Sequence, residues 1–175
     1  MAQCPWDLEF KDWNLYDMRI LMVCLGNICR SPIAEGVMRH KIKEHGLGWT
    51  VESAGTESYH IGEAPHRLSQ KECRKHGIDI SDQRAKKFTK ADLTAYDHVY
   101  AMATDVYREI EAIGGRHADM SRVGLFLDEL PSAGLGMTPR GQSVPDPYYG
   151  DEDGYKIVYD MIDKTCDAIV AKYGC

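Results

Sequence analysis

The sequence of 175 residues lacks several features that assign a protein to a class directly. Its six cysteines form no CxxC pair and no regular framework, and its seven histidines form no HExxH pattern. We therefore expect neither a metal site nor a disulfide scaffold. No apolar run is long enough to cross a membrane, and no internal repeat or low-complexity segment is visible. The length of 175 residues and the hydrophobic content of 43% are sufficient for one domain with a full hydrophobic core.

Basic residues are outnumbered by acidic ones. Lysine and arginine together number 21 against 27 aspartates and glutamates, which gives a net charge of -6. A general nucleic-acid-binding protein needs a basic surface to neutralise phosphate groups, so we expect no nucleic-acid partner. A small, locally positive pocket for an anion is compatible with this balance.

Residues 1–18 read as an extension ahead of a domain that spans residues 19–175. The extension lacks the basic start and apolar centre of a signal peptide, so we expect a cytoplasmic protein; unconventional export would leave no mark in the sequence. Its aromatic residues fall three or four positions apart, which favours a short amphipathic helix that docks on the domain or on a partner. These residues are Trp6, Phe10, Trp13 and Tyr16. A partly ordered tail is the alternative.

The rest of the chain alternates between strand-like and helix-like segments. We expect strands at 19–24, 49–54, 98–102 and 122–127, and helices at 31–45, 65–76, 89–93, 105–113 and 154–173. This order predicts an α/β domain, with a parallel sheet covered by helices on both faces. Ligands bind such sheets at the carboxyl ends of the strands, so the loop after the first strand is the first place to look for chemistry.

That loop reads CLGNICRS, from Cys24 to Ser31. Ser31 and the proline after it predict the N-cap and first position of a helix. Gly26 and Asn27 tolerate the left-handed backbone of a loop whose N–H groups wrap around an oxyanion. Arg30 can grip two phosphate oxygens, and the positive field favours the thiolate of Cys24. A cysteine with arginine six places later is weak evidence alone, and a buried core cysteine is the alternative for Cys24.

A second motif, VPDPYYG, lies within a long loop rich in proline and glycine at 131–153. Asp146 lies between Pro145 and Pro147, which hold its backbone extended and stiff. This arrangement suits a carboxylate that must be presented at a fixed place. An ordinary turn aspartate is the alternative if the loop is considered alone.

Taken together, CLGNICRSPIAEG and DPYYG resemble the low-molecular-weight protein tyrosine phosphatase family, and the segments WTVESAGT and RKHGI are also similar to family segments. The resemblance extends from about Arg19 to Tyr173. It implies a single α/β domain with a four-stranded parallel sheet, flavodoxin-like, in the order 2-1-3-4. It also implies hydrolysis of phosphotyrosine in proteins.

The resemblance assigns three catalytic roles. Cys24 attacks phosphorus and forms a phosphocysteine intermediate. Arg30 and the loop amides stabilise the charge on the equatorial oxygens. Asp146 protonates the departing tyrosine oxygen and then activates water for the second step.

Further residues follow from the same resemblance. Ser31 donates a hydrogen bond to the sulfur of Cys24, and Asn27 supports the loop geometry, with Ser53 and His76 as its partners behind the loop. The loop residues that bind phosphate and the aromatic residues expected at the mouth are Leu25, Gly26, Asn27, Ile28, Cys29, Trp49, Tyr148 and Tyr149. The expected partners are phosphotyrosine proteins, with inorganic phosphate as product and inhibitor. No cofactor is implied, because the loop and Arg30 supply the positive charge.

Related activities on the same fold stay open as alternatives. Arsenate reductases need further cysteines just after the third strand, and residues 100–105 contain none. Protein-arginine phosphatases carry threonine at the fifth loop position, where this chain has Ile28. A non-catalytic phosphotyrosine-binding module would not need both a thiol and an acid.

Two residues raise separate hypotheses. Cys29 could join Cys24 reversibly on oxidation and so protect the nucleophile, or it could simply fill space behind the loop. Ala103 departs from the family pattern, because family members commonly have aspartate directly after the methionine that corresponds to Met102. We therefore carry no acidic residue over to that position.

Overall fold

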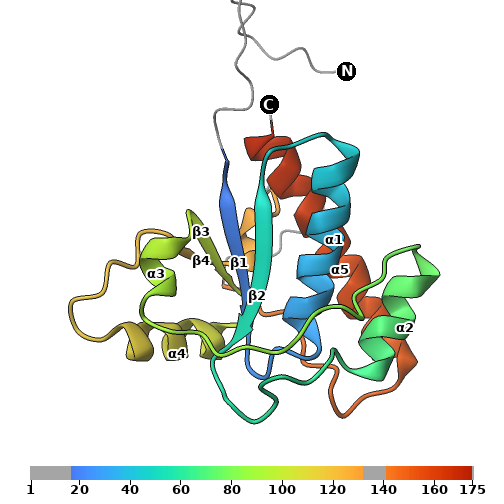
Figure 1. Ribbon diagram of the computed structural model, residues 1–175, viewed down its shortest axis with the longest axis horizontal. Coiled ribbons are helices and arrows are strands. Elements are labelled where there is room, and N and C mark those ends of the chain that lie inside the picture. Colours follow the sequence, from blue (N-terminus) through green and yellow to red (C-terminus); the bar gives the residue numbers. More distant parts are fainter. Residues whose placement is uncertain (1–16, 132–140, 175) are drawn as a thin grey trace, which may run out of the picture.

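The computed structural model describes residues 17–131 and 141–174. Four parallel strands form one sheet in the order β2-β1-β3-β4 (Figure 1). Their bounds are β1 Arg19–Cys24, β2 Thr50–Gly55, β3 His98–Ala101 and β4 Val123–Leu125. The predicted α/β class, single domain and strand order are confirmed. The helix predicted in residues 1–18 falls on the part of the chain outside the described residues, apart from positions 17 and 18.

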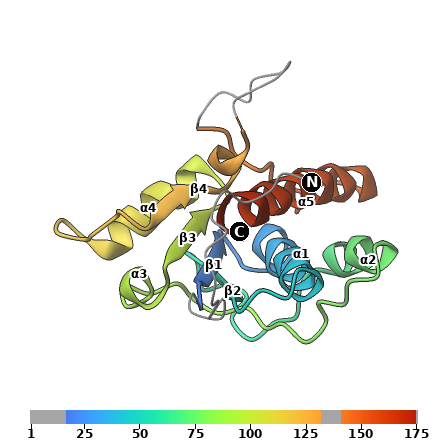
Figure 2. The ribbon, with the colours of Figure 1, turned by 90° about the horizontal axis from the view of Figure 1, so that it is seen from above.

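Helices cover both faces of the sheet (Figure 2). One face carries α1 Arg30–Glu44, α2 Arg67–Lys75 and α5 Glu152–Tyr173, and the other carries α3 Asp92–Ala95 and α4 Thr104–Gly114. Alternate residues of β1 enter the two cores, because successive side chains of a strand point to opposite faces. Ile20 and Met22 pack under α1 and α5, whereas Leu21 and Val23 pack towards α4. The apolar run of β1 is therefore buried on both sides.

All elements except β1 differ from their predicted bounds by one to three residues at one or both ends, and three of these differences are the most informative. Helix α1 begins at Arg30 with Cys29 as its N-cap, so the prediction of Ser31 as the N-cap is wrong. The hydroxyl of Ser31 bonds Cys24 and Asn27 instead of capping its own helix. Helix α3 begins at Asp92 rather than near residue 89. Strand β4 is short because the chain turns at once into a 3₁₀ helix, η1 Phe126–Glu129.

The carboxyl ends of the strands meet at one edge, at the bottom of Figure 1. β1 connects to β2 on one side and β3 connects to β4 on the other, so the chain leaves these two neighbouring strands in opposite directions, which opens a crevice between their carboxyl ends. The loop at 141–151 reaches the same edge, where the backbone N–H of Val144 donates to the carbonyl of Met102 at 2.7 Å. Within the described ranges, no helix is both long and apolar enough to span a bilayer.

Candidate active site

The loop between β1 and α1 depends on one left-handed residue. Asn27 has φ +56, the conformation that asparagine tolerates better than most residues. Gly55 at the end of β2 makes room for the loop, since a Cβ there would lie 2.7 Å from the carbonyl oxygen of Leu25. The sequence therefore shapes the loop from two sides, by Asn27 within it and Gly55 beside it.

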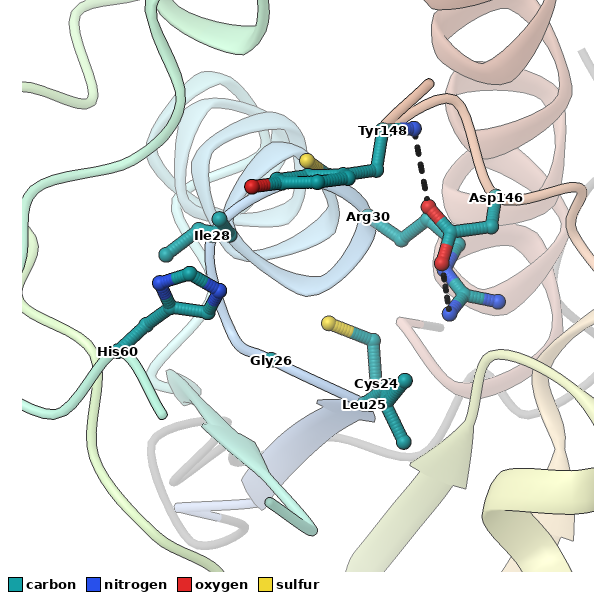
Figure 3. A pocket seen from close by; sticks show the side chains of 9 residues that line it. Cys24, Leu25, Gly26, Ile28, Arg30, His60, Asp146 and Tyr148 are labelled. Atoms are coloured by element: carbon teal, nitrogen blue, oxygen red, sulfur yellow. Dashed lines mark hydrogen bonds and ion pairs between the residues drawn. The ribbon is translucent and has the colours of Figure 1, made fainter. Parts of the chain in front are cut away.

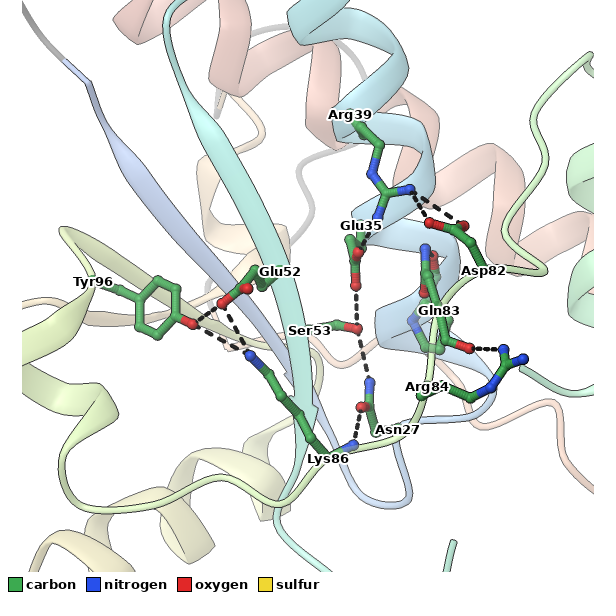
Figure 4. Close-up of polar contacts among 11 residues, drawn as sticks. Asn27, Glu35, Arg39, Glu52, Ser53, Asp82, Gln83, Arg84, Lys86 and Tyr96 are labelled. Atoms are coloured by element: carbon green, nitrogen blue, oxygen red, sulfur yellow. Dashed lines mark hydrogen bonds and ion pairs between the residues drawn. The ribbon is translucent and has the colours of Figure 1, made fainter. Parts of the chain in front are cut away.

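Asn27 makes hydrogen bonds to three segments, and Figure 4 shows those to Ser53 and Lys86. Its Nδ2 donates to the Oγ atoms of Ser31 and Ser53, both at 2.9 Å. Its Oδ1 accepts from the backbone N–H of Lys86 at 2.9 Å. The structure thus brings the predicted residues Asn27, Ser31 and Ser53 together behind the loop.

Glu35 completes this buried network and was not among the predicted site residues. The hydroxyl of Ser53 donates to Glu35 Oε2 at 2.6 Å, and Arg39 pairs with the other carboxylate oxygen and with Asp82 at the surface. Burial raises the pKa of Glu35 above its usual range. The available signal was its position four residues after Ser31, which places both on one face of α1.

The sulfur of Cys24 lies at the base of a pocket and is almost fully buried. Ser31 Oγ lies 3.0 Å from the sulfur, and the backbone N–H of Asn27 donates to it at 3.3 Å. The pocket wall also contains the loop residues Leu25, Gly26, Ile28 and Cys29.

Arg30 and Asp146 face each other on one side of this pocket (Figure 3). Arg30 Nη2 donates to Asp146 Oδ2 at 3.2 Å, and Nη1 donates to the carbonyl of Val144 at 3.2 Å. Asp146 Oδ1 accepts from the backbone N–H of Tyr148 at 3.0 Å. The arginine is buried while the carboxylate is about half exposed, so Asp146 reaches the pocket from the solvent side.

Tyr148 and Ile28 flank the pocket mouth, together with His60 from the loop after β2 (Figure 3). The ring centroids of His60 and Tyr148 are 6.2 Å apart, and His60 Nδ1 lies 2.9 Å from Glu63 Oε2. Tyr149 packs edge-on against Tyr148 and is 97% exposed, outside the pocket wall. Sequence reasoning missed His60, because no local pattern marks a loop residue that reaches a site formed by other segments.

Two predicted positions lie elsewhere. Trp49 precedes the first residue of β2 and is buried in the core under α1, so the prediction that it lines the mouth is wrong. The start of a parallel strand lies at the sheet edge opposite the carboxyl ends. His76 stacks on Tyr159 with ring centroids 3.9 Å apart and pairs with Glu72, and within the described chain no hydrogen bond, ion pair or ring contact joins it to the loop.

Cys29 lines the pocket but points its thiol towards the protein interior. Its Sγ lies 3.4 Å from the hydroxyl of Tyr155, which in turn lies 2.9 Å from His66 Nδ1. Burial raises the pKa of the Cys29 thiol to about 12, so its resting form is the neutral thiol. Reversible pairing of Cys29 with Cys24 stays a prediction.

No group of three or more histidine, cysteine, aspartate or glutamate side chains is placed to hold a metal ion in residues 17–131 and 141–174. The cation at the pocket is the guanidinium of Arg30. An arrangement of a thiol, a buried guanidinium and a carboxylate around one pocket suits transfer of a phosphoryl group to sulfur and then to water.

Comparison with known proteins identifies one family, both by a family model and by individual relatives. The model of the family described as low molecular weight phosphotyrosine protein phosphatase matches residues 19–173. The enzyme of that name from Mus musculus is 32% identical over 87% of this chain and 94% of its own length. The low molecular weight protein-tyrosine-phosphatase of Streptomyces coelicolor is 33% identical over 87% and 92%.

Solved structures agree with the sequence comparison. A protein tyrosine phosphatase from Entamoeba histolytica, crystallised with Hepes in its active site, superposes with a TM-score of 0.79 at 33% identity, covering 90% of this chain and 97% of that chain. The low molecular weight protein tyrosine phosphatase from T. tengcongensis gives 0.76 at 33% identity, covering 89% and 99%.

Proposed function

The chain belongs to the low molecular weight phosphotyrosine protein phosphatase family and is a protein-tyrosine phosphatase, and on this premise we propose that it hydrolyses phosphotyrosine through a phosphocysteine on Cys24. The main observation in support of this proposal is that Cys24, Arg30 and Asp146 line the same pocket. Arg30 and Asp146 are 116 residues apart in sequence, so only the fold joins them.

In the first step, the Cys24 thiolate attacks phosphorus, and the bond to the tyrosine oxygen breaks as the sulfur–phosphorus bond forms. Arg30 and the backbone N–H groups of the loop stabilise the charge on the equatorial oxygens. Asp146 donates its proton to the departing phenolate oxygen, which leaves as neutral tyrosine. Substrate phosphate accepts from the Arg30 Nη2 that otherwise donates to Asp146, and the carboxyl group then faces the leaving oxygen.

In the second step, the Asp146 carboxylate accepts a proton from water as the water oxygen attacks phosphorus. The sulfur–phosphorus bond breaks, and Cys24 returns to the thiolate with Ser31 donating to it. The product is inorganic phosphate, which fits the same donors as the substrate. We therefore propose that phosphate inhibits in competition with substrate.

The pocket wall supports an aromatic phosphate ester over the alternatives. Ile28 and Tyr148 offer apolar surface to a phenyl ring. Ile28 has no hydroxyl for a guanidinium phosphate, and the segment after β3, Met102 to Thr104, has no cysteine for arsenate reduction. A binding module would make no use of the general acid.

Steady-state assays with p-nitrophenyl phosphate and a phosphotyrosine peptide test the proposal. We expect Cys24→Ser to abolish phosphate release, while Cys73→Ser, which removes another buried free thiol, keeps it. Phosphoarginine and arsenate are assayed in parallel as the substrates of the two alternative activities, arginine dephosphorylation and arsenate reduction. Peptide binding without phosphate release by the wild type would establish a binding module instead.

The cellular setting and the domain boundary complete the proposal. Four described cysteines are free thiols, and a thiol nucleophile needs a reducing compartment, which supports a cytoplasmic location. The family match begins at residue 19, which supports an extension at 1–18 ahead of the catalytic domain.

A further inference from the structure

The segment that carries Asp146 is fastened to the junction between β3 and α4. The Oγ of Ser143 accepts from the backbone N–H of Thr104 at 2.9 Å and lies 3.4 Å from Thr104 Oγ1. The next residue, Val144, donates its N–H to the carbonyl of Met102 at 2.7 Å and accepts from Arg30 Nη1. Both residues that precede the Pro145-Asp146-Pro147 sequence are therefore anchored.

The donor to Ser143 is the backbone N–H of Thr104 at the start of helix α4, which finds no acceptor in the side chain of its own N-cap residue. The N-cap is Ala103, whose extended backbone suits a capping residue but whose methyl side chain accepts no hydrogen bond. The first N–H groups of a helix need acceptors from outside the helical ladder. Ser143, 39 residues downstream of Thr104, supplies one, so the cap of α4 is made by the segment that carries Asp146.

The anchored segment is stiff enough to transmit this contact to the carboxylate. Pro145 and Pro147 fix the backbone φ on both sides of Asp146. The side chain of Val144 is fully buried, and the Tyr148 N–H closes onto Asp146 Oδ1. With so few free rotations, the contacts at Ser143 and Val144 determine where the carboxyl group lies over Cys24.

We propose that Ser143 is a positioning residue for Asp146, which acts by capping helix α4 from the acid-bearing segment. The inference rests on the proposed function, because it gives Ser143 a role only through the proton transfer that Asp146 performs. Proton donation to a leaving group depends on the placement of the acid within a fraction of an ångström. A displaced acid therefore penalises most the substrates whose leaving groups need the proton most.

The first experiment compares kcat/KM across aryl phosphates whose phenols range from strongly to weakly acidic. Ser143→Ala is expected to lose roughly threefold to tenfold on the weakly acidic phenol and much less on the strongly acidic one. Asp146→Ala should show the same pattern with a larger loss. Ser143→Thr keeps the hydroxyl at an exposed position and should match the wild type.

A second variant separates positioning from simple helix stability. In the double variant Ala103→Ser with Ser143→Ala, helix α4 regains a capping hydroxyl at its own N-cap, but the segment of Asp146 stays unanchored. We expect the melting temperature to recover while the leaving-group dependence of Ser143→Ala persists. Recovery of both would overturn the positioning role, and so would an equal loss on all substrates in Ser143→Ala.

The two proposals fail in different ways. If Asp146→Ala shows leaving-group dependence and Ser143→Ala shows none, only the role of Ser143 is overturned. If Asp146→Ala shows no such dependence, Asp146 is not the general acid and both proposals fall.

Discussion

At the scale of single residues, the site depends on Asn27 as much as on the groups proposed to react. Its left-handed backbone turns the loop around the pocket, and its side-chain amide is bonded by three partners, in β2, in α1 and in the segment of Lys86. The amide therefore fixes a backbone conformation that is costly for other residues. Glu35 and Arg39 extend these contacts to the surface.

Two substitutions separate the backbone and side-chain roles of Asn27. Asn27→Gly removes the amide but allows positive φ, whereas Asn27→Ala removes the amide and strains the backbone. We expect both to lower kcat/KM, and Asn27→Ala to be less stable than Asn27→Gly by about 1 kcal/mol. Urea unfolding and steady-state kinetics measure the two effects. Equal stability of the variants would contradict the importance of the left-handed conformation.

His60 makes a second prediction at this scale. Because it stands in the pocket wall opposite Tyr148 and away from Asp146, we expect it to contribute to ground-state binding. His60→Ala should raise KM for a phosphotyrosine peptide severalfold with little change in kcat. Tyr59→Ala, at an exposed neighbour outside the pocket wall, is the matched control. A fall in kcat with unchanged KM would assign His60 a part in the chemistry instead.

At the scale of elements, helix α1 is arranged to leave its first N–H groups available to an anion. Its N-cap Cys29 makes no side-chain cap, and its first turn contains no acidic residue. Ser31, which could have capped the helix, is bonded to Cys24 and Asn27. The partial positive charge of the helix end is thus directed at the pocket.

Helix α2 has a cap that depends on pH. His66 Nδ1 accepts from the backbone N–H of Leu68 and lies 2.9 Å from the Tyr155 hydroxyl, and burial with Arg67 nearby lowers the pKa of His66. The unfolded chain therefore binds this proton more readily than the folded protein. The stability that His66 contributes is fully present above its unfolded pKa, about 6.5, and is lost as the pH falls towards the folded value.

Urea unfolding from about pH 7.5 to about pH 5 tests this dependence. Asparagine caps a helix without titrating in that range, so His66→Asn supplies the reference. We expect the stability of the wild type relative to His66→Asn to fall as the pH is lowered. A constant difference between the two proteins would show that His66 has the same pKa in both states.

At the scale of the whole molecule, the residues proposed to react lie at one edge of the sheet, and the opposite edge contributes mainly to the stability of the core. The loops at the carboxyl ends of the strands bring together residues from widely separated parts of the sequence, and the opposite edge contributes to the core. Trp49 shows the division. It was predicted at the pocket mouth, and it lies at the amino end of β2 among residues of the core under α1 and α5.

Trp49→Ala is therefore expected to cost about 3–5 kcal/mol of stability, because it removes a large buried side chain. KM and kcat measured well below the unfolding transition should stay close to the wild-type values. Denaturant unfolding and steady-state kinetics on the same preparations provide the comparison. A large rise in KM with unchanged stability would contradict the core position of Trp49 and show that it contributes to substrate binding.

The sequence by itself determined the α/β class and the loop from Cys24 to Arg30, because local periodicity, glycine placement and two short motifs carry that information, and the strand order followed from the resemblance to the phosphatase family. Even the distant Asp146 was recognisable, since flanking prolines and its motif mark it locally. Only the tertiary structure placed His60 in the pocket wall, Trp49 in the core and the Ser143 hydroxyl on helix α4. These contacts join segments that share no local pattern, and they depend on which ends of parallel strands meet at one edge.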